Sequence, residues 1–238
     1  MQDLSGFSKN LTKAKEQIQS KQLFLFDMNN TLLNIDKIDW YSYRSPLMQE
    51  FGINITYQDY LKYAGSRREL ILQRLYKDKT GKSLSKEKVK ELAQLGREFK
   101  TNVVLSEDFS QMVQLLPGVK EFLKWAKEQG KLMVVVTSTT RYYTPKLLKA
   151  AGILEFFDAI VTADDVSCGK PCPEPFEKGA ESVGLHANES VAFEDSFPGI
   201  KSAKSAGAFV IGVLTPGNND KAVQNADAVI TDYRQLLV

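Results

Sequence analysis

An aspartate that could act as a nucleophile follows a short apolar run near the start of the chain. Residues 23–26 are Leu-Phe-Leu-Phe, Asp27 comes next, and a polar loop begins at Asn29. In open α/β sheets, ligands bind in the crevice outside the carboxyl ends of the strands. If residues 23–26 form a buried strand, the Asp27 carboxylate therefore lies where a substrate would bind.

Three further segments hold polar side chains after apolar runs or in loops between them. A helix or turn cap explains any one of the Asp, Thr or Glu residues, and a solvated loop explains a single lysine. Their occurrence together favours one shared site. The side chains are Thr137 and Ser138 after residues 134–136, Lys170 in a Gly-Lys-Pro sequence, and Glu194 and Asp195 after residues 191–193.

Short runs rich in β-branched residues alternate with longer helical patterns, which is typical of a parallel sheet. Right-handed crossovers between such strands give an α/β fold with a doubly wound sheet and helices on both faces. The predicted strands are residues 23–26, 132–136, 159–161, 191–193, 209–213 and 228–230.

One interval, from about residue 36 to residue 116, has no convincing strand. Helical periodicity is found instead in residues 45–51, 56–63, 67–77 and 85–101, and Pro117-Gly118 closes the interval. We predict that residues 36–116 form a helical cap domain inserted into a core domain of residues 1–35 and 117–238. Residues 1–20 are expected to form a polar helical extension of that core.

The four segments resemble, in order, the motifs of the haloacid dehalogenase-like (HAD) hydrolase superfamily. Residues 169–176 and 194–200 match the capped subgroup that includes β-phosphoglucomutase-like and phosphoglycolate-phosphatase-like proteins. The resemblance spans about residues 21–237 and is weakest in the cap. It implies a Rossmann-like core and phosphoryl transfer from a small phosphorylated metabolite, most simply hydrolysis, through an aspartyl-phosphate.

The resemblance also implies a role for each polar residue. Asp27 would attack phosphorus, and Mg²⁺, which prefers oxygen ligands, would offset the repulsion between two anions. The implied magnesium ligands are Asp27, Asp195 and the Asn29 carbonyl, supported by Glu194. The implied phosphate-binding groups are Lys170, the Thr137 hydroxyl, Ser138 and the backbone N–H groups of Met28 and Asn30.

Asn29 departs from the family pattern Asp-x-Asp-x-Thr, in which the second Asp protonates the leaving oxygen and then activates the water or hydroxyl that attacks the acyl phosphate. A carboxamide cannot do so, and its loss of acid-base catalysis is expected to slow turnover by about 10²–10⁴-fold. Two explanations compete: a naturally silenced chain, or a phosphatase in which Asp was replaced. The retention of Lys170, Glu194 and Asp195 favours the second, an impaired enzyme.

Other readings of the motifs are a catalytically weak phosphate-binding or regulatory protein, a dehalogenase and a mutase. Adjacent Glu194 and Asp195 argue against a dehalogenase, because two acids beside a carboxylate nucleophile repel substrate unless a cation joins them. The single histidine, His186, lies away from the predicted strand ends, which disfavours a mutase that uses a cap histidine. In the cap, Gly65 and Arg68 resemble the family's substrate loop, although Arg68 is equally expected on a plain helix surface.

The composition and the net charge limit the kinds of partner that the protein is expected to bind. The chain has 238 residues, 31 basic and 29 acidic side chains and a pI near 8.3, which gives no electrostatic case for binding nucleic acid or a membrane. No apolar stretch has the length of a membrane span, and no signal peptide is recognisable, so a cytoplasmic protein is expected. We expect a monomer or weak homodimer, with Cys168 and Cys172 as free thiols.

Overall fold

A computed structural model describes residues 10–63, 68–104, 106–215 and 220–237 of the chain. Contacts between Cα atoms divide the chain into two compact units. The first unit is formed by Met1–Asn34 together with Val113–Val238, and the second by Ile35–Met112. Each unit is described by itself below. Within the part of the chain that the structure describes, no helix has both the length and the apolarity needed to cross a membrane.

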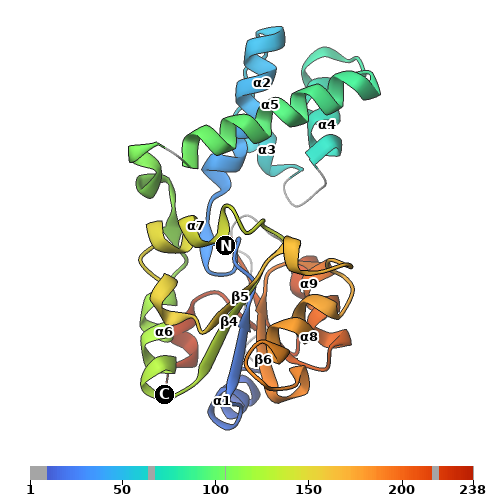
Figure 1. Cartoon of the computed structure of the whole chain (residues 1–238). Coiled ribbons are helices and arrows are strands. Elements are labelled where there is room, and N and C mark those ends of the chain that lie inside the picture. The colour runs from blue at the N-terminus through green and yellow to red at the C-terminus, as the bar shows by residue number, and fades with distance from the viewer. Residues whose placement is uncertain (1–9, 64–67, 105, 216–219, 238) are drawn as a thin grey trace. The chain divides into compact units, whose positions relative to one another are not determined.

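The first unit is built on a six-stranded sheet in which every neighbouring pair is parallel (Figure 1). The strand order is β5-β4-β1-β6-β7-β8, so that β1, buried on both faces, lies near the centre. The predicted α/β fold with a parallel sheet is confirmed. The strands are β1 (Leu23–Phe26), β4 (Leu132–Val136), β5 (Ala159–Val161), β6 (Ser190–Glu194), β7 (Phe209–Val213) and β8 (Ala228–Ile230).

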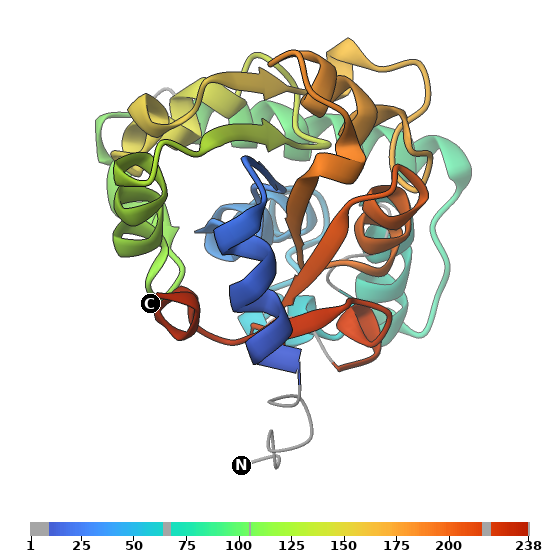
Figure 2. The same ribbon diagram turned by 90° about the horizontal axis from the view of Figure 1, so that it is seen from below.

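Helices cover both faces of this sheet (Figure 2). Because side chains alternate along a strand, Leu23 and Leu25 belong to the aliphatic cluster under α8 (Glu174–Glu181) and α9 (Phe197–Ser205). Phe24 and Phe26 point the other way, into an aromatic cluster with Phe122 of α6 (Val119–Glu128). The sheet is therefore doubly wound. This unit also contains α7 (Thr144–Ala150), α10 (Asp220–Val223), η4 (Leu154–Phe156), η5 (Ala163–Asp165) and η6 (Ala187–Glu189).

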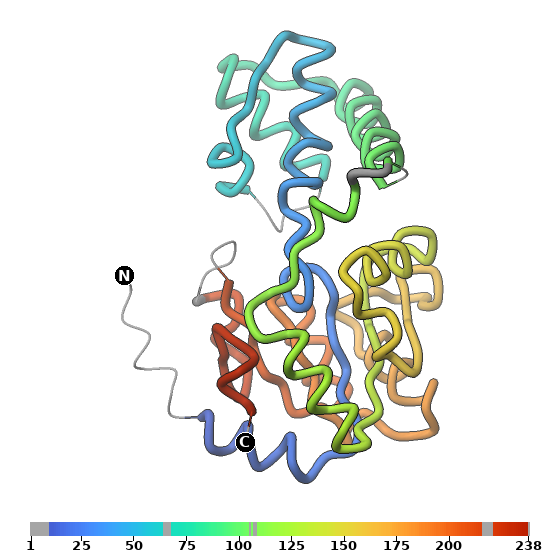
Figure 3. Tube along the Cα trace, turned by 90° about the vertical axis from the view of Figure 1, so that its left-hand side faces the viewer, coloured from blue at the N-terminus to red at the C-terminus, as the bar shows by residue number. Residues whose placement is uncertain are grey.

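The N-terminal helix α1 (Leu11–Ser20) packs on β8 and on η7 (Tyr233–Leu236), beside the last segment of the chain (Figure 3). Its side chains Ala14 and Ile18 are fully buried. Lys131 Nζ donates hydrogen bonds of 2.8 Å and 2.7 Å to the carbonyls of Gln19 and Lys21, at the C-terminal end of this helix. Residues 11–20 of the predicted extension thus form a helix that packs into the core of the unit, and residues 1–9 lie outside the described residues.

A short antiparallel pair, β2 (Leu33–Asn34) with β3 (Gln114–Leu115), corrects the expectation that no strand lies between residues 36 and 116. Each strand has two residues and β3 begins with a polar Gln. No apolar run marks such a short ladder in the sequence.

The second unit is helical. The predicted start of its first helix at residue 45 is wrong, because α2 begins at Asp36 and contains Pro46. Proline has no N–H to bond the carbonyl four residues earlier, that of Ser42. Gly96 of α5 approaches this carbonyl so closely that a Cβ at Gly96 would lie 2.4 Å from it. The helices are α2 (Asp36–Phe51), α3 (Tyr57–Leu61), α4 (Arg68–Thr80), α5 (Lys86–Val104) and η3 (Glu107–Met112).

Candidate active site

Asp27 lies at the carboxyl end of β1, where its backbone N–H donates to the carbonyl of Phe193 on β6 at 3.0 Å. The residue is 8% exposed. The following loop is tight: the Met28 carbonyl accepts from the N–H groups of Leu32 and Leu33. Asn30 has φ of +59°, a left-handed conformation that Asn tolerates better than most residues. β1 and this loop therefore hold the Asp27 side chain at the sheet end.

Lys170 joins three of the strand ends. Its Nζ donates to Asp27 Oδ1 at 2.7 Å, to Glu194 Oε1 at 2.6 Å and to the Val136 carbonyl at 2.9 Å. The lysine side chain is 6% exposed. A buried ammonium with three acceptors has all its protons committed. The structure thus brings together Asp27, Lys170 and Glu194, three of the residues that the sequence motifs singled out.

The Glu194 carboxylate is fully buried against the start of α9. Its Oε2 accepts from the backbone N–H and the hydroxyl of Ser196, at 3.0 Å and 2.9 Å. Ser196 is also the N-cap of α9, where its Oγ accepts from the Gly199 N–H. A Cβ at Gly199 would lie 1.7 Å from Glu194 Oε1. Glycine at this position is therefore what lets the carboxylate lie against the helix.

Burial and charge both act on this cluster. Burial, opposed by Lys170 and reinforced by Glu194, raises the pKa of Asp27 to about 7. Burial and the charges of Glu194 and Asp27 likewise raise the pKa of Asp195 well above its ordinary value. Burial lowers the pKa of Lys170, but Asp27 and Glu194 more than reverse this, so that its pKa is raised. The cluster holds three carboxylates around one ammonium, and a further cation would favour their ionised forms.

Thr137 follows β4 and is buried, whereas Ser138 is exposed. The Thr137 Oγ1 accepts from the Thr139 N–H at 3.1 Å, which leaves the hydroxyl able to donate its own proton. Lys170, Thr137 and Ser138 border a pocket of about 290 Å³, together with Ser167 and Gly169. The expected phosphate-binding side chains therefore line one pocket.

Among the backbone donors predicted to bind phosphate, Asn30 has another acceptor. Its N–H donates to the Leu33 carbonyl at 2.7 Å, inside the loop. The phosphate role expected for Asn30 conflicts with this bond, because the tight turn after Asp27 uses the N–H itself. The role of the Met28 N–H remains a prediction.

Asn29 contacts a residue that the sequence reading did not single out. Its Nδ2 donates to Thr139 Oγ1 at 3.0 Å, and its Oδ1 is buried with no hydrogen-bond partner among the described residues. A buried carbonyl without a donor is costly, so this oxygen is suited to accept from a water or a substrate hydroxyl. The only sequence signal for Thr139 is its position two residues after Thr137.

The donors fit Mg²⁺. Asp27 and Asp195 supply carboxylate oxygens, which Mg²⁺ prefers as ligands. The buried Asn29 Oδ1 beside them accepts no hydrogen bond from the described residues. The cluster also holds more carboxylates than ammonium groups, so a cation would reduce the repulsion between them. No group of three or more His, Cys, Asp or Glu side chains in the described residues has an arrangement that would hold a metal ion.

The loop that carries Lys170 contains a disulfide bond between Cys168 and Cys172. The expectation of free thiols is therefore wrong. The chain has only two cysteines, with Gly-Lys-Pro between them, and so few cysteines did not suggest a disulfide framework. The turn around Lys170, in which the Cys172 N–H donates to the Gly169 carbonyl, holds the two Cα atoms 5.9 Å apart, within the usual range for a bridge.

Comparison with known families agrees with the motifs at these strand ends. Residues 24–213 match the profile of the haloacid dehalogenase-like hydrolases. The chain belongs to this family.

Relatives within the family include named phosphatases. A validoxylamine A 7′-phosphate phosphatase of Streptomyces hygroscopicus subsp. limoneus is 34% identical over 119 residues, which cover 50% of this chain and 55% of that protein. A phosphorylated carbohydrates phosphatase of Thermotoga maritima is 34% identical over 122 residues, 51% of this chain and 56% of that protein. The matched region thus spans little more than half the length of these curated relatives.

A solved structure extends the similarity over nearly the whole chain. It is described as a predicted phosphoglycolate phosphatase from Haemophilus somnus 129PT, and it matches with a TM-score of 0.77 and 24% identity over 92% of this chain and 97% of that one. At this identity the match shows the shared fold.

In this HAD-like chain, the residues expected to read the substrate lie in the helical unit. Gly65 lies outside the described residues. Arg68 begins α4, donates from Nη1 to Ser42 Oγ at 3.0 Å and stacks over the Tyr43 ring at 4.5 Å. These contacts hold α4 against α2, so helix packing already explains in part why an arginine stands at this position. Its substrate role stays a prediction.

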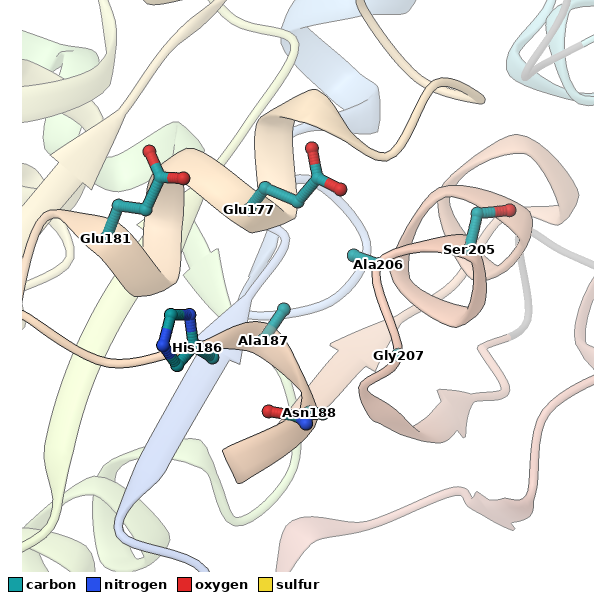
Figure 4. A pocket seen from close by; sticks show the side chains of 8 residues that line it. All are labelled: Glu177, Glu181, His186, Ala187, Asn188, Ser205, Ala206 and Gly207. Atoms are coloured by element: carbon teal, nitrogen blue, oxygen red, sulfur yellow. The ribbon is translucent and has the colours of Figure 1, made fainter.

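A second pocket, of about 500 Å³, lies between α8, η6 and the end of α9 (Figure 4). Glu177, Glu181 and His186 are among its lining residues. His186 precedes η6 and β6, so it lies at the start of the strand that carries Glu194 at its end. The histidine is thus away from the strand ends, as expected from the sequence.

Proposed function

We propose that this chain binds a small phosphorylated metabolite and, with Mg²⁺, transfers its phosphoryl group to Asp27. The observation that carries this proposal is the position of the Lys170 ammonium, 2.7 Å from Asp27 and 2.6 Å from Glu194 beside a pocket that Thr137 also lines. Relatives named for phosphorylated carbohydrates and for validoxylamine A 7′-phosphate support a phosphorylated carbohydrate or a similar phosphomonoester as substrate.

Each residue has a defined task in this reaction. An Asp27 oxygen attacks phosphorus as the bond to the leaving oxygen breaks, giving an aspartyl-phosphate. The Thr137 hydroxyl donates to a phosphoryl oxygen, where negative charge is greatest. Lys170 places its positive charge beside the same oxygens, and one of its three hydrogen bonds would have to be exchanged before it could donate to them. Asp27 and Asp195 would hold Mg²⁺, which supplies positive charge at the phosphoryl group. Glu194 accepts a hydrogen bond from Lys170 and so orients its ammonium group.

Asn29 limits both halves of the reaction. In the first half its carboxamide cannot protonate the leaving oxygen of the substrate. Water must be activated to attack the aspartyl-phosphate, and the Asn29 carboxamide cannot take its proton. The Thr139 hydroxyl that accepts from Asn29 is also too weak an acid or base near neutral pH to replace a carboxylate. We infer slow turnover and accumulation of phosphoenzyme with substrates whose leaving groups need no proton.

A second candidate function is phosphate binding without turnover, and Asn29 itself favours it. The site retains the side chains expected to bind phosphate, but Asn29 stands in place of the carboxylic acid that would exchange a proton. A dehalogenase is disfavoured, because the carboxylates of Glu194 and Asp195 beside Asp27 would repel substrate without a cation. A mutase that depends on a histidine is disfavoured by the position of His186. We also propose that the helical unit, Ile35–Met112, is the cap that selects the substrate.

The test compares this chain with Asn29→Asp on a panel of phosphorylated metabolites with Mg²⁺, measured by phosphate release. Turnover is expected to rise by at least about 10²-fold, the lower end for one acid-base group. The matched control is Asn29→Asp combined with Asp27→Asn, which should release no phosphate above background. If Asn29→Asp is folded and inactive on the whole panel but phosphate still binds, the binding protein is the better description.

A further inference from the structure

The Cys168–Cys172 bond closes a small ring around Lys170. The ring contains Gly169, Lys170 and Pro171, so the buried lysine lies at its middle. Cys168 is exposed to solvent, whereas Lys170 Nζ is buried on Asp27 and Glu194. An attacking molecule can therefore reach one sulfur of the bond from outside without entering the active site.

The ring is anchored at both ends. The Glu174 carboxylate, in the first turn of α8, accepts from the N–H groups of Ser167 and Cys168 at 2.9 Å and 2.7 Å. On the other side, Ser202 of α9 donates to the Cys172 carbonyl. Between these anchors the disulfide is the covalent link that limits the path of the backbone to Lys170.

We propose that Cys168–Cys172 is a thiol–disulfide exchange site, through which small thiols of the glutathione class control how firmly Lys170 is held. This inference rests on the role proposed for Lys170 in phosphate binding, and it adds a means of regulating that site. Cys168 is exposed, and exposed disulfides exchange most readily with small thiols.

The exchange balances in two steps. A thiolate attacks the exposed Cys168 sulfur, the disulfide bond breaks and Cys172 leaves as a thiolate that takes up a proton. A second thiolate attacks the mixed disulfide, frees Cys168 as a thiol and leaves as the oxidised disulfide of the small thiol. Two electrons pass to the protein, and two small thiols are oxidised. The reverse reaction, with glutathione disulfide, closes the ring again.

Opening the ring gives the residues between Cys168 and Cys172 more freedom. Lys170 must then lose more conformational entropy to reach Asp27 and Glu194. The oxidised chain, in which Lys170 makes all three of its hydrogen bonds, is therefore the form with the ordered site. The reduced chain is expected to bind phosphate more weakly and to expose the lysine more often.

Acylation of lysines, followed by mass spectrometry, tests this without relying on catalysis. The chain is equilibrated with glutathione disulfide or with dithiothreitol and then treated with acetic anhydride. Reduction should increase labelling of Lys170 by at least about threefold, well within the roughly 30-fold that loop-closure entropy allows for a ring of about five residues. Lys131 is the internal control: it is 9% exposed and bonded to two carbonyls, but no disulfide encloses it, so its labelling should not change.

A binding experiment complements the labelling. Calorimetry with inorganic phosphate and Mg²⁺ should give weaker binding for the reduced chain, and a Cys168→Ser/Cys172→Ser variant should match the reduced chain under both conditions. A chain whose cysteines stay reduced in glutathione disulfide would overturn the proposal, as would equal Lys170 labelling in both redox states. If Lys170 labelling responds but phosphate binds in neither state, the exchange site stands and the proposed function fails.

Discussion

At the scale of single residues, the three carboxylates around Lys170 make stability depend on pH. Burial, partly offset by Lys170, raises the pKa of Asp27 from 3.8 to about 7. Between pH 4 and pH 7 the folded chain therefore binds a proton that the unfolded chain has released, and the free energy of unfolding falls as the pH rises through this range. The raised pKa of Asp195 acts in the same direction.

We predict that, with a chelator present, urea unfolding gives a lower free energy of unfolding at pH 8 than at pH 5. The Asp27→Asn variant is the control and should lose part of this slope, because its side chain does not titrate. Carboxylates with lowered pKa, such as Asp59, titrate below this range. Stability that rises from pH 5 to pH 8 would contradict the raised pKa of Asp27.

Gly199 leads to a second prediction at this scale. A Cβ there would overlap the Glu194 carboxylate, so Gly199→Ala should move that carboxylate away from Lys170 or shift the start of α9. We expect a loss of about 1–3 kcal/mol in thermal or urea unfolding, together with weaker phosphate binding. Gly169→Ala is the control for stability, because nothing lies within 4 Å of its added Cβ. Equal stability of the two variants would show that the close approach carries no cost.

The sequence predicted which charged residues meet in the site, but it did not predict the contacts that the surrounding loops make. Asp27, Lys170 and Glu194 stand in motifs whose order implied that they meet, and they do meet in the structure. The Asn29 contact with Thr139 and the exposed disulfide had no such signal. Both depend on how the loops fold back over the strand ends, which short sequence patterns do not determine.

At the scale of elements, the strands were predictable because they are apolar on both faces of the sheet. Five of the strand ranges agree residue for residue, and β6 is longer by one residue at each end. The first half of α2 was missed, because Pro46 is typical of a helix boundary and the helix has little amphipathic pattern. Its stability comes instead from packing against α5.

A substitution at Gly96 tests the packing of α2 against α5. Gly96→Ala would place a Cβ against the Ser42 carbonyl and close to Arg68 Nη1, so α2 and α5 should separate slightly. We predict a loss of about 1–3 kcal/mol in the stability of the helical unit, seen as faster amide hydrogen exchange in α2 and α5. Gln94→Ala, at an exposed position on the same helix, should leave the exchange rates unchanged. Unchanged rates in Gly96→Ala would argue against close helix contact.

At the scale of the whole molecule, α1 joins the beginning of the described chain to its end. Its buried face packs on β8 and η7, and Lys131 holds its last turn. Lys131→Met removes the donor from two carbonyls, and we predict that the free energy of unfolding falls by about 1–3 kcal/mol while phosphate binding is retained. Lys124→Met, on the exposed face of α6, is the matched control. Equal stability of the two variants would show that the Lys131 hydrogen bonds do not hold α1 to the rest of the unit.

The two tryptophans of the chain are divided between the two units. Trp125 stacks on Phe122 in the sheet unit, with ring centroids 5.5 Å apart, while Trp40 in α2 donates from its indole N–H to the Ile55 carbonyl at 3.1 Å. Each unit therefore carries its own intrinsic fluorophore. Emission from Trp40→Phe reports on the sheet unit and emission from Trp125→Phe on the helical unit, so that unfolding of the two can be followed separately without an added dye.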